Sequence, residues 1–155
     1  MSTPLPSIKD LIDLANLKSL FDNFSQITGC SVTLIDQATD EILLKTGWCR
    51  LCAEFFSTNP AADKACRTCN RTLTDKLGEP GRLLLQHCDH GLVVGAIPIF
   101  VEGYHLANLL SGQVLFSPPD IPTFQKRARF YQFDEPSYLA ALSEIPIVSE
   151  QNFSS

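Results

Sequence analysis

Two Cys-x-x-Cys pairs constrain this chain more than any other feature of its sequence. Cys49 pairs with Cys52 and Cys66 with Cys69, and thirteen residues separate the two pairs. On a helix, side chains at positions i and i+3 face the same way, with Cβ atoms about 5–6 Å apart. Each pair can therefore direct two thiolates at one ion, and Cys88 offers a fifth thiol. The spacing predicts a metal site held by four of these five cysteines.

Zinc is the metal predicted for such a set of thiolates, because it is redox-inert and accepts four cysteines in tetrahedral geometry. An iron–sulfur cluster is the alternative, since four cysteines suit it equally well. A third interpretation is a thioredoxin-like dithiol, because Trp48 directly precedes the first pair. Two features oppose this interpretation. Arg50 and Leu51 occupy the two positions between the cysteines, where thioredoxin-like motifs carry Gly-Pro, and the chemistry of a single dithiol does not account for the second Cys-x-x-Cys pair. Cys30 lies outside both pairs, and we expect it to fill a core position.

The composition is typical of a globular domain in a reducing compartment. The 155 residues are 45% hydrophobic and 19% charged, which suits one domain with one core. No apolar run approaches the roughly 20 residues of a membrane helix, and the first ten residues lack the features of a signal peptide. We therefore expect a cytoplasmic protein without membrane contact. The net charge of −5 argues against direct binding of nucleic acid.

Hydrophobic periodicity and turn signals predict an alternation of helices with short strands. Helices are expected over 7–29, 49–60, 61–81 (ending at Gly78), 123–133 and 135–145, and strands within 31–46, 82–88, 91–101 and 104–116. Strands that follow one another through tight turns are antiparallel, so the predicted fold class is α+β. The apolar strands after residue 91 are expected at the centre of the sheet. Pro98 conflicts with a regular central strand and predicts a bulge or an edge there.

Several short motifs occur in the order in which they occur in the PocR sensory domain family. The matching segments are Cys49-Arg50-Leu51, Cys66-Arg67-Thr68-Cys69, Cys88-Asp89-His90-Gly91-Leu92, Pro98-Ile99 and Ser111-Gly112-Gln113-Val114. The chain resembles this family over roughly residues 10 to 145. The resemblance implies a PAS-like antiparallel sheet flanked by helices, with a cysteine-rich helical insertion.

The same resemblance implies a function in signal transduction. Domains of this family lie in transcription activators, histidine kinases and other signalling proteins, and they are thought to bind small hydrocarbon derivatives such as diols. By position, the family's recurrent cysteines correspond to Cys49, Cys66 and Cys88, which leaves Cys52 or Cys69 as a fourth metal ligand. We expect residues 1–155 to form one such domain with a core over 10–145. Residues 147–155 would then begin a linker to an effector module or partner protein, and the domain is a candidate homodimer.

A small-molecule pocket is expected between the central strands and the cysteine-bearing helices. Its predicted lining is Phe55 and Phe56, with Tyr104, Asn108 and Gln113 as polar contacts. The sequence contains no Gly-rich phosphate loop, no nucleophile elbow and no His-Glu-x-x-His motif, so we expect no enzyme. The remaining alternatives are a metal- or iron–sulfur-based redox sensor, a purely structural zinc module and, further off, a dithiol enzyme.

Overall fold

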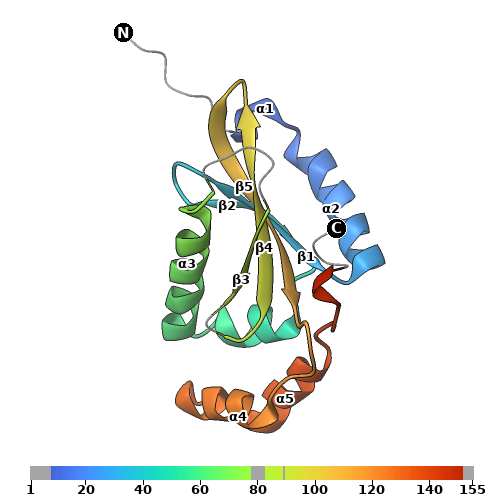
Figure 1. The fold of residues 1–155 in the computed structure, drawn as a ribbon, viewed down its shortest axis with the longest axis vertical. Helices are drawn as coiled ribbons and strands as arrows, with labels where there is room; N and C mark the ends of the chain where they lie inside the picture. The colour runs from blue at the N-terminus through green and yellow to red at the C-terminus, as the bar shows by residue number, and fades with distance from the viewer. Residues whose placement is uncertain (1–7, 78–82, 89, 152–155) are drawn as a thin grey trace.

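One antiparallel sheet forms the centre of the domain (Figure 1). The computed structural model describes residues 8–77, 83–88 and 90–151. Within them, five strands are ordered β2-β1-β5-β4-β3, and each neighbouring pair is antiparallel. The strands are β1 (Ser31–Asp36), β2 (Ile42–Thr46), β3 (Leu84–His87), β4 (Val93–Val101) and β5 (Tyr104–Val114). The predicted α+β class, with an antiparallel sheet flanked by helices, is confirmed, and β4 and β5 lie centrally as expected.

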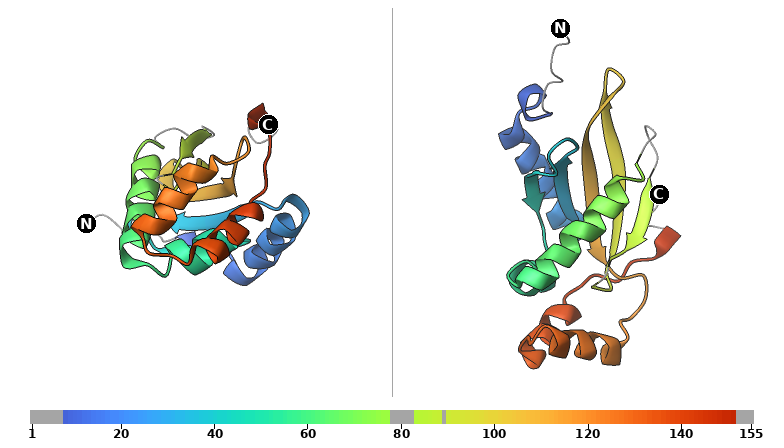
Figure 2. Two further views of the ribbon diagram at one scale, coloured as in Figure 1. Left: turned by 90° about the horizontal axis from the view of Figure 1, so that it is seen from below. Right: turned by 90° about the vertical axis from the view of Figure 1, so that its left-hand side faces the viewer.

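Helices cover both faces of this sheet and one of its ends. They are α1 (Ile8–Leu11), α2 (Leu14–Thr28), the π-helix η1 (Leu51–Phe56), α3 (Pro60–Thr74), α4 (Ile121–Phe130) and α5 (Glu135–Ser143). Helix α2 lies on one side of the sheet and α3 on the other, whereas α4 and α5 lie below the end of the sheet near η1 (Figures 1 and 2). Three of the cysteines lie on η1 and α3, which connect β2 to β3; that this connection is an insertion stays a prediction.

Capping residues set the boundaries of the helices. The helix predicted over 7–29 is divided in two, because the carboxylate of Asp13 accepts hydrogen bonds from the backbone N–H groups of Ala15 and Asn16 and so begins a new helix. Gly29 ends α2 in the left-handed conformation, with φ of 74°. Asn59 caps α3 in the same manner as Asp13 caps α2. The predicted end of that helix, Gly78, lies outside the described residues.

Pro98 lies where the described part of the sheet leaves one side of β4 unpaired. Strand β3 pairs only with Val93–Ala96, so the following residues of β4 pair with β5 alone. Proline has no N–H to donate to a second neighbour, and this position does not require one. The pairing register also shifts between Ile99 and Phe100. The predicted edge is therefore found at Pro98 itself, and the predicted bulge is found close to it, between Ile99 and Phe100.

Helix α3 packs on two different partners along its length, and this positions the functional site. Near its C-terminal end, Leu73 and Leu77 pack against the sheet residues Ile35 and Leu110. Near its N-terminal end, Ala62 instead joins the apolar cluster formed by η1, α4 and α5. The helix is thus fastened at both ends while a cavity remains between its middle and the sheet.

None of the helices in the described ranges has the length and apolar character required to cross a membrane.

Candidate functional site

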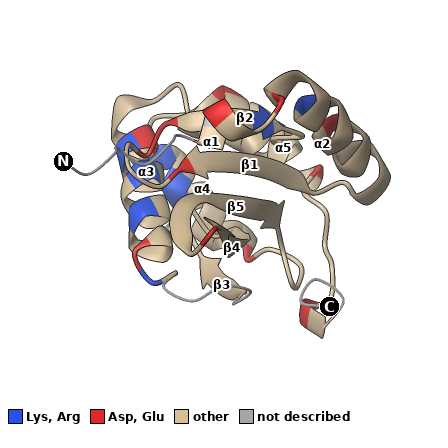
Figure 3. Cartoon of the chain, turned by 90° about the horizontal axis from the view of Figure 1, so that it is seen from above, with Lys and Arg blue, Asp and Glu red and all other residues tan. Residues whose placement is uncertain are grey.

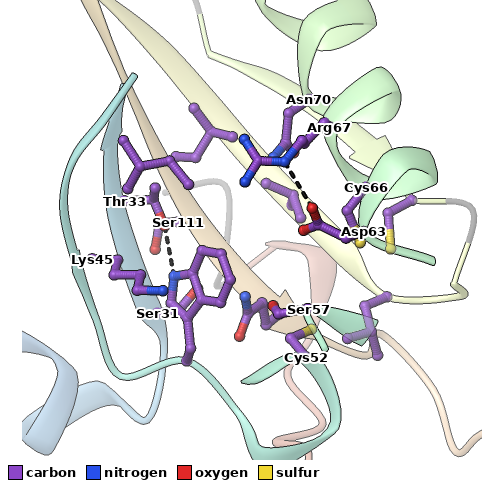
Figure 4. A pocket seen from close by; sticks show the side chains of 17 residues that line it. Ser31, Thr33, Lys45, Cys52, Ser57, Asp63, Cys66, Arg67, Asn70 and Ser111 are labelled. Atoms are coloured by element: carbon purple, nitrogen blue, oxygen red, sulfur yellow. Dashed lines mark hydrogen bonds and ion pairs between the residues drawn. The ribbon is translucent and has the colours of Figure 1, made fainter. Parts of the chain in front are cut away.

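A cavity of about 250 Å³ lies between the sheet, η1 and α3 (Figure 4). Its floor is formed by the sheet, and its walls by the segment around Trp48 and by α3. The lining residues are Ser31, Thr33, Leu92, Val94, Leu110, Ser111 and Gln113 on and beside the inner strands, Ile42, Lys45, Trp48, Cys52 and Ser57 on one wall, and Asp63, Cys66, Arg67, Asn70 and Cys88 on the other. The volume lies below the range of about 300–1,000 Å³ typical of sites for drug-sized ligands. The cavity therefore suits a small molecule.

A bulge in β5 brings Gln113 to the cavity. Gly112 has φ of 148°, and a Cβ atom there would lie 2.5 Å from the carbonyl oxygen of Val93. Gln113 itself has φ of 55°, and the pairing with β4 shifts register at this point. Bulges redirect side chains and recur beside functional sites. Here the Gln113 amide oxygen accepts a hydrogen bond of 2.8 Å from the backbone N–H of Cys49. The bulge therefore ties the floor of the cavity to the first cysteine pair.

Trp48 forms a wall of the cavity and is fixed by two contacts. Its indole N–H donates a hydrogen bond of 2.9 Å to the hydroxyl oxygen of Thr33 on β1. The ammonium group of Lys45 lies 4.8 Å from the centroid of the indole ring, within the distance of a cation–π contact. The sole tryptophan of the chain thus has a defined orientation at the site.

A row of polar residues on α3 faces the cavity from the opposite side. Asp63, Arg67 and Asn70 follow one another at helical spacing, and all three line the cavity. The Nε atom of Arg67 donates to the Asp63 carboxylate at 2.8 Å. Arg67 and Asn70 also line a second cavity of about 210 Å³, toward the turn between β1 and β2. These two side chains therefore lie at the junction of the two cavities.

The structure places three of the five predicted metal ligands around the main cavity. Cys52, Cys66 and Cys88 line it. Cys49 does not line it, but its side chain is hydrogen-bonded to that of Cys52. Cys69 is buried, and its sulfur accepts a hydrogen bond of 2.9 Å from the side-chain amide of Gln86 on β3.

The thiols influence one another electrostatically. The hydrogen bond with Cys52 lowers the pKa of the Cys49 thiol, although burial opposes this. The pKa of Cys52 is raised by the same hydrogen bond and by burial, and further by the neighbouring charges of Cys88 and Cys66. Burial also raises the pKa of Cys88. Of the two thiols of the first pair, Cys49 is therefore the one that ionises more readily.

These cysteines do not form a metal centre as they are placed. In the described segments of the chain, no three His, Cys, Asp or Glu side chains come close enough together to hold an ion. The metal, whether zinc or an iron–sulfur cluster, stays a prediction from the sequence. Cys30 lies in a small core cluster with Val93 and Val114, as expected.

Of the predicted ligand contacts, Gln113 lines the cavity and the other four lie elsewhere. Phe55 and Phe56 pack edge-on against Tyr138 in the cluster below the sheet. Tyr104 is exposed at the turn between β4 and β5. Asn108 is buried, and its side-chain amide bonds to His105 and to Gln37, whose partner atoms lie 2.6 Å away in each case. A ligand role for these four residues remains untested.

Sequence reasoning missed several residues that line the cavity, among them Lys45, Arg67 and Asn70. The helical spacing of Asp63, Arg67 and Asn70 is the signal that was available, since these positions lie on one side of α3. On its own, such a polar row indicates a solvent-exposed face equally well. The sequence pattern does not reveal that α3 stands away from the sheet at the positions of Arg67 and Asn70.

The chain is similar to one known protein family over nearly its whole length. A family model described as the sensory domain found in PocR matches residues 10–155. Among proteins of curated function, none shows significant similarity.

Two solved structures with PAS-like or sensor folds are similar to the chain. The PAS domain of BvgS from Bordetella pertussis is 15% identical, with a TM-score of 0.40, over 77% of this chain and 96% of that domain. The sensor domain of the zinc-responsive histidine kinase CzcS from Pseudomonas aeruginosa is 12% identical, with a TM-score of 0.36, over 66% of this chain and 75% of that one.

Proposed function

Because the chain belongs to the family of sensory domains found in PocR, we propose that it is the ligand-sensing part of a signalling or transcription-regulatory protein. Its ligand is a small hydrocarbon derivative such as a diol, and the domain is not an enzyme. The observation that carries the proposal is the cavity of about 250 Å³ between the sheet and α3. Apolar residues such as Leu92 and Leu110 line it together with hydroxyl and amide groups, the mixture that binds a small, weakly polar molecule.

The route from the cavity to an output begins at the end of β5. Leu115 follows the bulge by two residues, and its N–H donates to the carbonyl of Pro146. The carbonyl of Leu115 in turn accepts from the N–H of Val148. The segment that leaves the domain is thus fastened to the strand that carries Gln113. A ligand that binds one packing of this region better than another shifts the equilibrium between them, and residues 147–155 would convey the change to an effector module or partner protein.

The test is a thermal-shift screen of short diols, alcohols and aldehydes. A bound ligand at about 100 times its Kd stabilises the native state by about 2.7 kcal/mol, which corresponds to a shift of roughly 5–10 °C for a domain of this size. Gln113→Ala is expected to reduce the shift. Gln132→Ala is the matched control, because Gln132 also has a positive φ, of 60°, and is exposed outside the cavity. A screen in which no compound raises the melting temperature would refute the binding of a neutral ligand of this class.

A second candidate function is a thiol-based sensor that holds zinc or, alternatively, an iron–sulfur cluster. It is favoured by the placement of Cys52, Cys66 and Cys88 around one cavity. Cys52 is the better fourth ligand beside Cys49, since the sulfur of Cys69 already accepts a hydrogen bond from Gln86. Metal binding would require these thiols to turn toward one another.

Elemental analysis of anaerobically purified protein tests this candidate. Cys66→Ser is expected to lose the metal and destabilise the domain, whereas Cys30→Ser, which alters only a small core cluster, is expected to have a mild effect. Equal losses of melting temperature in both variants would contradict the assignment. The absence of zinc and iron from protein whose thiols all titrate freely would remove the candidate altogether.

A further inference from the structure

Resting on the proposed function, we infer that the cavity selects ligands with one negative charge, and that Arg67 binds that charge. The ligand class is a short-chain carboxylate, which combines a small apolar chain with an anionic head group. This goes beyond a neutral diol, because it assigns a head-group site and a residue that determines specificity.

Arg67 presents an oriented but incompletely used guanidinium group. Its Nε atom is held by Asp63 at 2.8 Å, and within the described residues its two terminal nitrogens have no hydrogen-bond or ion-pair partner. Those nitrogens form the fork that recognises a carboxylate through two parallel hydrogen bonds. In Figure 4 the guanidinium of Arg67 lies across the cavity from Lys45. Asn70, which lines the same two cavities, offers a further N–H donor.

The charged side chains that line the main cavity leave an excess of one positive charge. Lys45 and Arg67 line the main cavity with Asp63 as the one acidic residue, and Asp63 is engaged by Arg67. Asp40, at the second cavity, is bound by Arg71 through both carboxylate oxygens at 2.8 Å. Lys45 has no carboxylate partner among the residues that the structure describes, and its ammonium group lies over the ring of Trp48. Figure 3 shows Lys and Arg positions on α3, with Asp and Glu positions among them, beside the hairpin of β1 and β2. One ligand carboxylate would neutralise this excess.

The remaining lining suits the rest of such a molecule. Leu92, Val94 and Leu110 provide an apolar surface on the floor of the cavity, where a short carbon chain would lie. Ser31 is buried, and its hydroxyl borders the cavity without a hydrogen bond to another described residue. A hydroxyl group at the far end of the ligand would find a partner there. The complementary arrangement of charge, apolar surface and hydroxyl is that of a short hydroxy acid.

The experiment compares 3-hydroxypropionate with 1,3-propanediol, which has the same number of carbon atoms but no charge. Binding is followed by the fluorescence of Trp48, the single tryptophan of the chain. In the unaltered protein, the carboxylate is expected to bind at least tenfold more tightly than the diol, and to weaken as the salt concentration rises. Arg67→Gln is expected to weaken carboxylate binding at least tenfold and to leave diol binding unchanged.

Lys64→Gln is the matched control, because Lys64 lies on the same helix, is exposed and does not line either cavity. Arg67→Lys keeps the positive charge but lacks the two terminal nitrogens that bind a carboxylate together. We expect it to bind 3-hydroxypropionate more tightly than Arg67→Gln and more weakly than Lys64→Gln. Equal affinity for diol and carboxylate would overturn the charge selectivity and leave the sensing role intact. Equal carboxylate binding by Arg67→Gln and Lys64→Gln would overturn the role of Arg67. If neither compound changes the Trp48 signal and the screen of neutral compounds also fails, the cavity is not a ligand site and both proposals fall.

Discussion

Replacement of Gly112 by alanine tests whether the bulge in β5 is required by the fold. Gly112 has φ of 148°, where side chains other than hydrogen are rarely found, and its Cβ would lie 2.5 Å from the carbonyl oxygen of Val93 and 2.9 Å from the Cα of Val94. Both neighbours are backbone atoms of the paired strand, so they cannot move aside by rotating a side chain. The substitution must therefore displace β4, distort β5 or both.

The expected loss of stability has two contributions. An unfavourable φ costs about 1–3 kcal/mol for a residue with a side chain, and overpacking adds about 1–3 kcal/mol. The control is Gly103→Ala, because Gly103 also has a positive φ, of 84°, but no atom lies within 4 Å of its expected Cβ. Gly103→Ala should show the backbone contribution alone, at about 1–2 kcal/mol. We expect Gly112→Ala to be destabilised by about 3–5 kcal/mol in total.

Urea denaturation followed by circular dichroism provides the measurement, with the free energy of unfolding taken by linear extrapolation. A domain at the lower end of the usual range of about 5–15 kcal/mol would remain folded in the control and have a free energy of unfolding close to zero in the variant. If Gly112→Ala and Gly103→Ala differ by less than about 0.5 kcal/mol, the close approach of β4 and β5 at the bulge is not as described. The role of Gln113, which depends on that bulge, would then lose its basis.

Three further predictions concern the surroundings of the cavity. Thr33→Val is expected to lower stability by about 1 kcal/mol, because the Trp48 indole N–H loses its acceptor; an unchanged urea midpoint would contradict this. In metal-free protein near pH 8, Cys49 is expected to react with iodoacetamide before Cys88, since a lowered pKa leaves more thiolate than a raised one; the reverse order in timed mass spectra would disprove the described thiol arrangement. Asp40→Asn is expected to change stability by at most about 1 kcal/mol, because its ion pair is half exposed, and a larger loss would show that the pair holds α3 in place.

The order and type of the secondary-structure elements could be predicted from the sequence because they depend on local signals. Periodic apolar residues indicated the helices, and Gly29, the last residue of the first predicted helix, is the residue that ends α2. The family was also accessible, since its short motifs occur in order along the chain. The division of the first helix at Asp13 was missed because apolar spacing continues across the break, whereas the side-chain hydrogen bonds that cause the break have no periodic signal.

The site was predicted only in part, because its lining comes from six helices and strands and from the loops between them. Gln113 was found through its motif, but the reason for its position is the backbone conformation of Gly112. Phe55 and Phe56 were expected to line the pocket from the short helix that carries the first cysteine pair. The π-helical turn of η1 instead directs them to the cluster around Tyr138. Arg67 was treated as the spacer of a Cys-x-x-Cys pair, and its place between two cavities follows only from the way α3 stands off the sheet.

The proposed function requires that a small molecule occupies the cavity between the sheet and α3. A crystal structure of the protein grown with 3-hydroxypropionate or 1,3-propanediol, whichever binds more tightly, would show whether it does. We expect ligand density enclosed by Trp48, Gln113 and Arg67, with the hydrogen bond from the Cys49 N–H to Gln113 retained or replaced by a bond to the ligand. A cavity closed by its own side chains, or ligand density at another place on the domain, would contradict it.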